Sequence, residues 1–127
     1  MKTITRLFVA LGLSAMATLA LAAGKPFNQA EFDALQKAGQ PIFLKVHADW
    51  CPTCKAQDPI VQSQIDHPDH QNITFFVIDF DKEKRVLRSM RITRQSTLVT
   101  FKDGKEVSRT VGDTTPAGVA ALVATVR

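Results

Sequence analysis

Short apolar runs alternate with amphipathic segments along most of the chain. Runs rich in strand formers and bounded by turn residues predict strands, whereas apolar residues at helical spacing predict helices. Four strands are predicted, at residues 41–46, 73–79, 97–102 and 106–111. Helices are predicted at residues 28–38, 51–65, 82–90 and 115–126.

The order of these elements indicates the fold class. Strands separated by helices imply right-handed parallel crossovers, and Asp103-Gly104 is a hairpin signal that adds an antiparallel strand at one edge. Asn28 followed by Glu31 has the form of a helix-capping box. We therefore predict an α/β fold, a mixed four-stranded sheet with helices on both faces, formed by a single domain over residues 24–127.

The first 23 residues have the pattern of a secretory signal peptide. Lys2 and Arg6 precede an apolar stretch over residues 7–19, and the small residues of the Ala-Leu-Ala segment at 20–22 suit a signal peptidase. We expect residues 1–23 to be removed and the remainder to be exported to a periplasm. An uncleaved membrane anchor is the alternative reading, although the apolar stretch is short for a span.

The charge balance argues against one class of partner. The chain of 127 residues carries 16 basic and 12 acidic side chains, for a net charge of +4. Without the two basic residues of the predicted signal peptide, 14 basic residues stand against the same 12 acidic ones. A nucleic-acid partner requires a concentrated basic surface, so we expect none.

The chain contains two cysteines, Cys51 and Cys54. A bridge across two intervening residues closes almost no loop and removes little unfolded-state entropy, so the spacing indicates chemistry rather than stability. The segment Trp50-Cys51-Pro52-Thr53-Cys54-Lys55 follows a predicted strand and opens a predicted helix, whose N-terminus lowers a thiol pKa. We expect Cys51 to be the exposed attacking thiolate and Cys54 to be shielded one turn inside the helix.

The cysteines also form part of a pattern close to a zinc finger. His67 and His70 follow at a suitable distance, but only two residues separate them and Pro59 interrupts the required helix. We therefore interpret His67 and His70 as solvated loop residues and assign no metal ligands.

The sequence resembles the thioredoxin family from about residue 27 to residue 126. Besides residues 50–55, the resemblance rests on Thr-Leu-Val-Thr-Phe-Lys-Asp-Gly-Lys at 97–105 and on Val111-Gly112. It implies a thiol–disulfide oxidoreductase that needs no diffusible cofactor and acts on protein substrates carrying disulfides or dithiols.

Site residues follow from the resemblance position by position. It implies that Cys51 is the nucleophile and Cys54 the resolving thiol. It also implies a groove for the substrate backbone, lined by Trp50, Gln95, Ser96 and Gly112.

Two positions depart from the family pattern. Ser96 stands where the family usually has a cis-proline, and a cis bond before a non-proline residue costs about 3–4 kcal/mol. Lys45 stands where the family has a buried aspartate beneath the resolving cysteine. A neutral Lys45 could accept the Cys54 proton, whereas a charged one would stabilise thiolate and make the couple more oxidising. We include Lys45 among the catalytic candidates; a lysine that reaches to an edge of the sheet is the alternative.

The function predicted from these observations is disulfide exchange in exported proteins. The Cys-Pro-Thr-Cys motif is similar to that of periplasmic reductants serving cytochrome c maturation, so we expect a reductant rather than an oxidant. A reductant in that compartment needs electrons from a membrane partner, and we expect a monomer. Two alternatives stay open: a metal or iron–sulfur binding module, motivated by Ser96 and nearby His47, and a redox-inert interaction domain.

Overall fold

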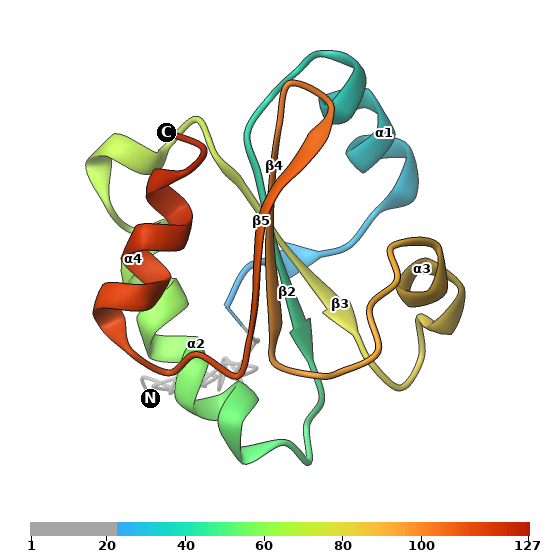
Figure 1. Ribbon diagram of the computed structural model, residues 1–127, viewed down its shortest axis with the longest axis vertical. Coiled ribbons are helices and arrows are strands. Elements are labelled where there is room, and N and C mark those ends of the chain that lie inside the picture. Colours follow the sequence, from blue (N-terminus) through green and yellow to red (C-terminus); the bar gives the residue numbers. More distant parts are fainter. Residues whose placement is uncertain (1–22) are drawn as a thin grey trace, which may run out of the picture.

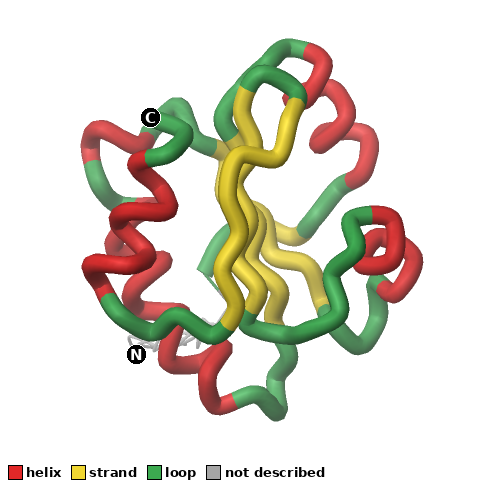
Figure 2. Tube along the Cα trace, in the orientation of Figure 1, coloured by secondary structure: helices red, strands yellow, loops and turns green. Residues whose placement is uncertain are grey.

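The computed structural model describes residues 23–127, and the predicted signal peptide lies, except for Ala23, outside the described residues. One mixed sheet crosses the middle of the domain and is covered by helices on both sides (Figures 1 and 2). The spatial order of its strands is β1-β3-β2-β4-β5. The strands are β1 (Lys25–Pro26), β2 (Ile42–His47), β3 (Thr74–Asp79), β4 (Thr97–Lys102) and β5 (Lys105–Val111).

The predicted strand count was too low by one. The four predicted strands are present, with β1 and β2 parallel to β3, and β4 antiparallel to β2 and β5. The additional strand is β1, which pairs Lys25 with Phe76 and Pro26 with Val77. Two residues are too few to show an alternating pattern, so only the pairing with β3 identifies them as a strand.

Four α-helices and one short 3₁₀ helix complete the described part of the chain. Helices α2 and α4 cover one face of the sheet, and α1 and α3 cover the other (Figure 1). The bounds are α1 (Gln29–Lys37), α2 (Pro52–Ile65), η1 (Pro68–His70), α3 (Lys84–Ser89) and α4 (Pro116–Ala124). Within residues 23–127, none of the helices has the length and apolar character needed to cross a membrane.

Local capping explains where the helices start. The Asn28 side chain accepts a hydrogen bond from the Glu31 backbone N–H at 2.9 Å, as the capping-box pattern predicts. Helix α3 starts two residues later than predicted, because the Asp79 carboxylate accepts the backbone N–H groups of Asp81 and Lys82 and holds them in a turn. A side-chain cap thus fixes the start of α1, and a turn delays the start of α3.

The central strand β2 is buried on both faces and leads directly to the cysteines. Ile42, Leu44 and Val46 pack in the core under α1 and α3, whereas Phe43 packs in the core under α2 and α4. A strand turns successive side chains to opposite faces, so Lys45 shares the α2 and α4 side with Phe43. The strand therefore delivers one charged side chain into the layer that carries the cysteine helix.

Candidate active site

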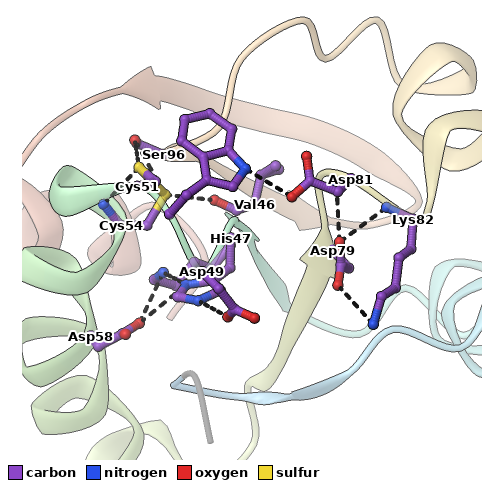
Figure 3. Close-up of polar contacts among 12 residues, drawn as sticks. Val46, His47, Asp49, Cys51, Cys54, Asp58, Asp79, Asp81, Lys82 and Ser96 are labelled. Atoms are coloured by element: carbon purple, nitrogen blue, oxygen red, sulfur yellow. Dashed lines mark hydrogen bonds and ion pairs between the residues drawn. A yellow bond between two sulfur atoms is a disulfide. The ribbon is translucent and has the colours of Figure 1, made fainter.

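The two cysteines form a disulfide at the N-terminus of α2, just beyond the end of β2 (Figure 3). Their Cα atoms are 5.3 Å apart. Cys51 is the N-cap residue, with extended backbone, and its Sγ accepts the Cys54 backbone N–H at 3.1 Å. Pro52 follows at the first helical position, where the missing N–H is not needed and the fixed φ suits a helix. A sulfur atom thus takes the place that a serine or aspartate oxygen has in most helix caps.

The predicted contrast in exposure between the two cysteines is wrong. Cys51 is 2% exposed and Cys54 is 0% exposed, because both pack with Ala48 and Phe80 and lie against Ser96. The sulfurs differ in their partners instead. Cys51 Sγ accepts a backbone N–H, whereas Cys54 Sγ lies 3.7 Å from the Val46 carbonyl oxygen, which can only accept. The first arrangement stabilises a thiolate and the second stabilises a thiol.

Ser96 is held against the disulfide by an unusual backbone conformation. The Gln95–Ser96 peptide bond is trans, and Ser96 has a φ of 62°, in the left-handed region where a non-glycine residue costs about 1–3 kcal/mol. Its N–H donates to the Val46 carbonyl oxygen at 2.9 Å. Its hydroxyl lies 3.4 Å from Cys51 Sγ and 3.5 Å from Cys54 Sγ. A serine in this place can therefore form hydrogen bonds to the reacting atoms, which a proline cannot.

Gln57 is a site residue that sequence reasoning missed. It is fully buried on α2, and its Nε2 donates to the Ser96 carbonyl at 3.1 Å and to the Asp113 carbonyl at 3.0 Å. The Gly112 N–H also donates to the Ser96 carbonyl, at 3.0 Å. Gln57 lies one helical turn after Cys54, and a polar residue on the buried side of a helix was the available signal.

Lys45 is completely buried, which excludes the alternative of a lysine that reaches an edge of the sheet. Its Nζ lies 2.9 Å from Asp58 Oδ1, in an ion pair that is not aligned as a hydrogen bond, and 3.1 Å from His47 Nδ1. Burial lowers the pKa of Lys45, and the Asp58 carboxylate opposes part of that shift. Asp58 was not identified from the sequence, because nothing local links it to a lysine on another element.

His47 connects Lys45 to the surface. Its Nε2 lies 3.2 Å from Asp49 Oδ1, and the Asp49 side chain is fully exposed. A protonated Lys45 can only donate, so His47 Nδ1 then accepts and Nε2 carries the ring proton toward Asp49. The His47 ring nitrogens thus face Lys45 and Asp49 rather than the cysteines.

Three of the four predicted groove residues lie together. Gln95, Ser96 and Gly112 line an open hollow of about 450 Å³ beside the N-terminal turn of α2. Trp50 does not line it; the indole is 56% exposed and its Nε1 donates to Asp81 Oδ2 at 2.8 Å. Two larger hollows, of about 590 and 550 Å³, lie away from the cysteines and contain none of the predicted site residues.

The histidines of the zinc-finger-like pattern do not approach the cysteines. His67 is about half exposed and caps η1, as its loop assignment predicts, but His70 is 5% exposed with Nδ1 at 2.9 Å from the Gln64 carbonyl oxygen. The prediction of a solvated His70 is wrong because the ring packs against the end of α2. Among residues 23–127, no three or more His, Cys, Asp or Glu side chains are grouped as metal ligands would be.

Comparison with known proteins matches a family model described as "Thioredoxin" over residues 24–125. The thioredoxin of Chlamydia trachomatis is 32% identical over 71 residues, which cover 56% of this chain and 68% of that protein. Thioredoxin-2 of Saccharomyces cerevisiae is 28% identical over 98 residues, covering 76% of this chain and 91% of its own.

Solved structures show the same arrangement of elements. The crystal structure of Trxlp from Edwardsiella tarda EIB202 superposes with a TM-score of 0.76 at 33% identity, covering 80% of this chain and 98% of that one. Malassezia sympodialis thioredoxin gives a TM-score of 0.72 at 21% identity, covering 86% of this chain and 97% of that one, and supports the fold alone.

Proposed function

The chain belongs to the thioredoxin family, and from that premise we propose an exported enzyme that reduces disulfides in protein substrates. It is a thiol–disulfide oxidoreductase with Cys51 and Cys54 as its redox-active pair, and thioredoxins act generally on protein disulfides. One observation carries the proposal: the disulfide lies at the first turn of α2, with Cys51 Sγ accepting a helix N–H.

The two sulfurs take different roles in this proposal. Cys51 attacks as thiolate, because the helix N-terminus and the Cys54 N–H favour its charged form. Cys54 waits as thiol, because its sulfur faces the Val46 carbonyl oxygen. Cys54 then attacks Cys51 Sγ in the mixed disulfide and releases the reduced substrate. The substrate backbone docks over the hollow lined by Gln95, Ser96 and Gly112.

Lys45 acts as the buried proton acceptor in this proposal. Burial lowers its pKa, so the buried ammonium gives up a proton more readily than an exposed lysine, and the amine that results can take a proton when Cys54 ionises. Lys45 contacts His47, and His47 contacts the exposed Asp49, so these two contacts offer that proton a path to the surface.

The same features support reductant rather than oxidant activity. An oxidant needs strongly stabilised thiolates, for which a buried uncompensated cation would serve well. Burial instead lowers the pKa of Lys45, and the Asp58 carboxylate offsets the charge of the protonated form. Together with the Cys-Pro-Thr-Cys motif, this supports a dithiol that donates electrons, replenished by a membrane partner.

The reduction potential tests the direction of transfer. The protein is equilibrated in glutathione buffers, and the fraction of the Cys51–Cys54 disulfide is measured by thiol alkylation. We expect a potential at or below about −230 mV, whereas a value near −120 mV would identify an oxidant. Cys51→Ser serves as the control, since it must abolish turnover of a disulfide substrate if the pair does the chemistry.

Export is tested separately, by expressing the full chain in a bacterial host and fractionating the cells. The proposal expects a periplasmic protein whose mass corresponds to a start near Ala23 or Gly24. Full-length protein in the membrane fraction would support an uncleaved anchor instead, and full-length protein in the cytosol would contradict export.

A metal or iron–sulfur module is the second candidate, because Ser96 leaves the sulfurs without the proline that the family places there. His47, the third ligand considered from sequence, faces Lys45 and Asp49. Anaerobic purification followed by metal analysis decides between the two candidates. Stoichiometric metal favours the module, and metal-free protein that exchanges disulfides excludes it.

A further inference from the structure

The hydroxyl of Ser96 lies between the two sulfurs of the redox pair. Its distances to Cys51 Sγ and Cys54 Sγ are nearly equal, at 3.4 and 3.5 Å (Figure 3). Within the described residues, these sulfurs are the hydrogen-bond partners of the hydroxyl, and Ser96 is 4% exposed. The hydroxyl hydrogen is therefore directed at sulfur rather than at solvent.

Three backbone contacts from different parts of the fold fix this position. The Ser96 N–H donates to the Val46 carbonyl of β2, and its carbonyl accepts from Gln57 of α2 and from Gly112 beyond β5. The strand β2 and the helix α2, which position the cysteines, thus also position the hydroxyl. Little reorganisation is needed when charge develops on sulfur, and such preorganisation is what makes a hydrogen bond effective in catalysis.

The backbone conformation of Ser96 is unusual for a residue that has a side chain. A φ of 62° suits glycine, and a glycine here would keep all three backbone contacts without the strain. What serine adds at this position is a Cβ and a hydroxyl next to the disulfide. Strain held at a reactive centre is consistent with a functional group being positioned there.

We propose that Ser96 is a catalytic residue whose hydroxyl donates a hydrogen bond to each cysteine thiolate in turn. It stabilises the Cys51 thiolate before attack and the Cys54 thiolate before resolution. This inference rests on the proposed disulfide exchange. It goes beyond the groove-lining position implied by family resemblance, because it assigns the hydroxyl a contact with the reacting atoms.

The two steps balance as follows. The Cys51 thiolate attacks one substrate sulfur, a bond forms between them, and the substrate disulfide breaks to release a first thiolate. The Cys54 thiol loses its proton, which the first released thiolate finally takes up. The Cys54 thiolate then attacks Cys51 Sγ, forming the Cys51–Cys54 disulfide and releasing the second substrate thiolate. The substrate gains two electrons and the protein loses two.

The second step depends on Ser96 more than the first does. Cys51 Sγ has another donor, the Cys54 N–H, whereas the other contact of Cys54 Sγ among the described residues is the Val46 carbonyl oxygen, which cannot donate. Lys45 and His47 on β2 and Asp58 on α2 contact one another, and His47 also contacts Asp49. The hydrogen bonds of the Ser96 hydroxyl are with the sulfurs and involve none of these groups. Their effect on the sulfurs should therefore be the same with or without the hydroxyl.

Two substitutions separate the hydroxyl from the backbone. Ser96→Ala removes the hydroxyl and retains the strained φ, whereas Ser96→Gly removes the hydroxyl and relieves the strain. Ser63→Ala is the matched control. It removes an exposed hydroxyl of α2 that donates to the Ile60 carbonyl and has no contact with the sulfurs. Folding of each protein is checked by circular dichroism, and Ser96→Gly is expected to fold even if Ser96→Ala does not.

The first readout is the Cys51 pKa in the reduced protein, followed through the ultraviolet absorbance of the thiolate. Loss of a charge-assisted hydrogen bond should raise this pKa by about one unit, a tenfold fall in thiolate population below the pKa. The glutathione equilibrium should shift about tenfold toward the disulfide, making both variants stronger reductants. Ser63→Ala should match the parent protein in both measurements.

The second readout is the rate at which Cys54 resolves a mixed disulfide formed between Cys51 and thionitrobenzoate. We expect both Ser96 variants to slow this release, by a larger factor than they slow alkylation of Cys51. Unchanged pKa and resolution rate in both variants would overturn the proposal. A change in Ser96→Ala alone would also overturn it, because backbone geometry would then be the cause.

Failure of the proposed function is a distinct result. If the parent protein itself reduces no disulfide substrate, the exchange function falls regardless of the Ser96 variants. If the parent protein exchanges disulfides and the variants match it, only the role of Ser96 falls.

Discussion

The two faces of the sheet differ in the polarity of the side chains that β2 buries there. Under α1 and α3, β2 presents Ile42, Leu44 and Val46 to an entirely apolar cluster. Under α2 and α4, the same strand presents Phe43 and then Lys45 and His47. The polar part of this second face lies at the end of the strand that leads to Cys51, whereas Phe43 packs within an apolar cluster.

The comparison shows how a buried cation is tolerated. Lys45 has no exposed surface, yet its ammonium group contacts a carboxylate from α2 and an imidazole from its own strand. Removing a charge from water costs several kcal/mol, so these partners are required for folding with the lysine charged. The apolar face contains no such partners in its described cluster, and its stability comes from packing.

The largest effect is expected from moving the cation to the other face. Leu44→Lys places an ammonium in the apolar cluster without a partner, and should lower the free energy of unfolding by about 4 kcal/mol. Chemical denaturation of the oxidised protein measures the change. Leu44→Met, which nearly conserves volume, should cost less than about 1.5 kcal/mol. Equal losses in the two variants would show that this apolar cluster tolerates an unpaired ammonium, which would contradict the proposed contrast with the face that contains Lys45.

Removing the partner of Lys45 should have the next largest effect. Asp58→Asn leaves the buried ammonium without its carboxylate and should destabilise the protein by about 2 kcal/mol, less than for a fully buried pair because the Asp58 side chain is 27% exposed. It should also lower the pKa of Lys45 further, since Asp58 raises it. Asp66→Asn, at the exposed end of the same helix, is the control and should change stability little.

Removing the cation should make the two faces alike. Lys45→Met should raise the free energy of unfolding near neutral pH by about 1.5 kcal/mol, because an apolar side chain needs no desolvation of charge. Burial lowers the folded-state pKa of Lys45 below its ordinary value of 10.5, so between those two values the unfolded chain binds more protons. Stability of the parent protein therefore gains a contribution that rises with pH through that window.

The pH profile of the difference between the two proteins checks this sign. Denaturation of the parent protein and of Lys45→Met is measured across the alkaline range, where other titrating groups cancel in the difference. The advantage of the methionine variant should shrink as pH rises. Parallel profiles would mean that Lys45 keeps its ordinary pKa in the folded protein.

The smallest effect is expected at the helix N-caps, because helices on both faces have one. Asn28→Ala removes the cap of α1 and should cost about 1 kcal/mol of stability. Thr115→Ala removes the cap of α4 on the opposite face and should cost a similar amount. Neither should alter the glutathione equilibrium of the cysteines; a shift in either variant would show that capping reaches the redox site.

The sequence predicted best what is encoded within a few neighbouring residues. The cap at Asn28, the hairpin at Asp103-Gly104 and the strand–cysteine–helix order are local patterns, and the structure confirms each. The prediction failed where burial depends on distant partners. His70 is buried although it follows a polar turn, and Cys51 is buried although it begins a helix.

The site residues also divide into those that local sequence identified and those that depend on distant partners. Cys51 and Cys54 were identified from their spacing, and Lys45 from its position within an apolar strand. Asp58 and Gln57 were not identified, because each acts through a partner on another element: Asp58 through Lys45, and Gln57 through the carbonyl of a residue 39 positions away. Hydrophobic pattern shows which face of a helix is buried but not which polar atom it meets there.

By itself, the sequence determined the α/β order of elements, the reactive pair and the position of a lysine within an apolar strand, since periodicity, turn chemistry and spacing are local properties. Only the tertiary structure decided that Lys45 pairs with Asp58 and that Ser96, 45 residues from Cys51, turns its hydroxyl to both sulfurs. Both arrangements come from contacts between separate elements, and the strained backbone of Ser96 is maintained by bonds from β2, α2 and the segment beyond β5. Such contacts exist once the sheet has assembled, because no short stretch of the chain contains both partners.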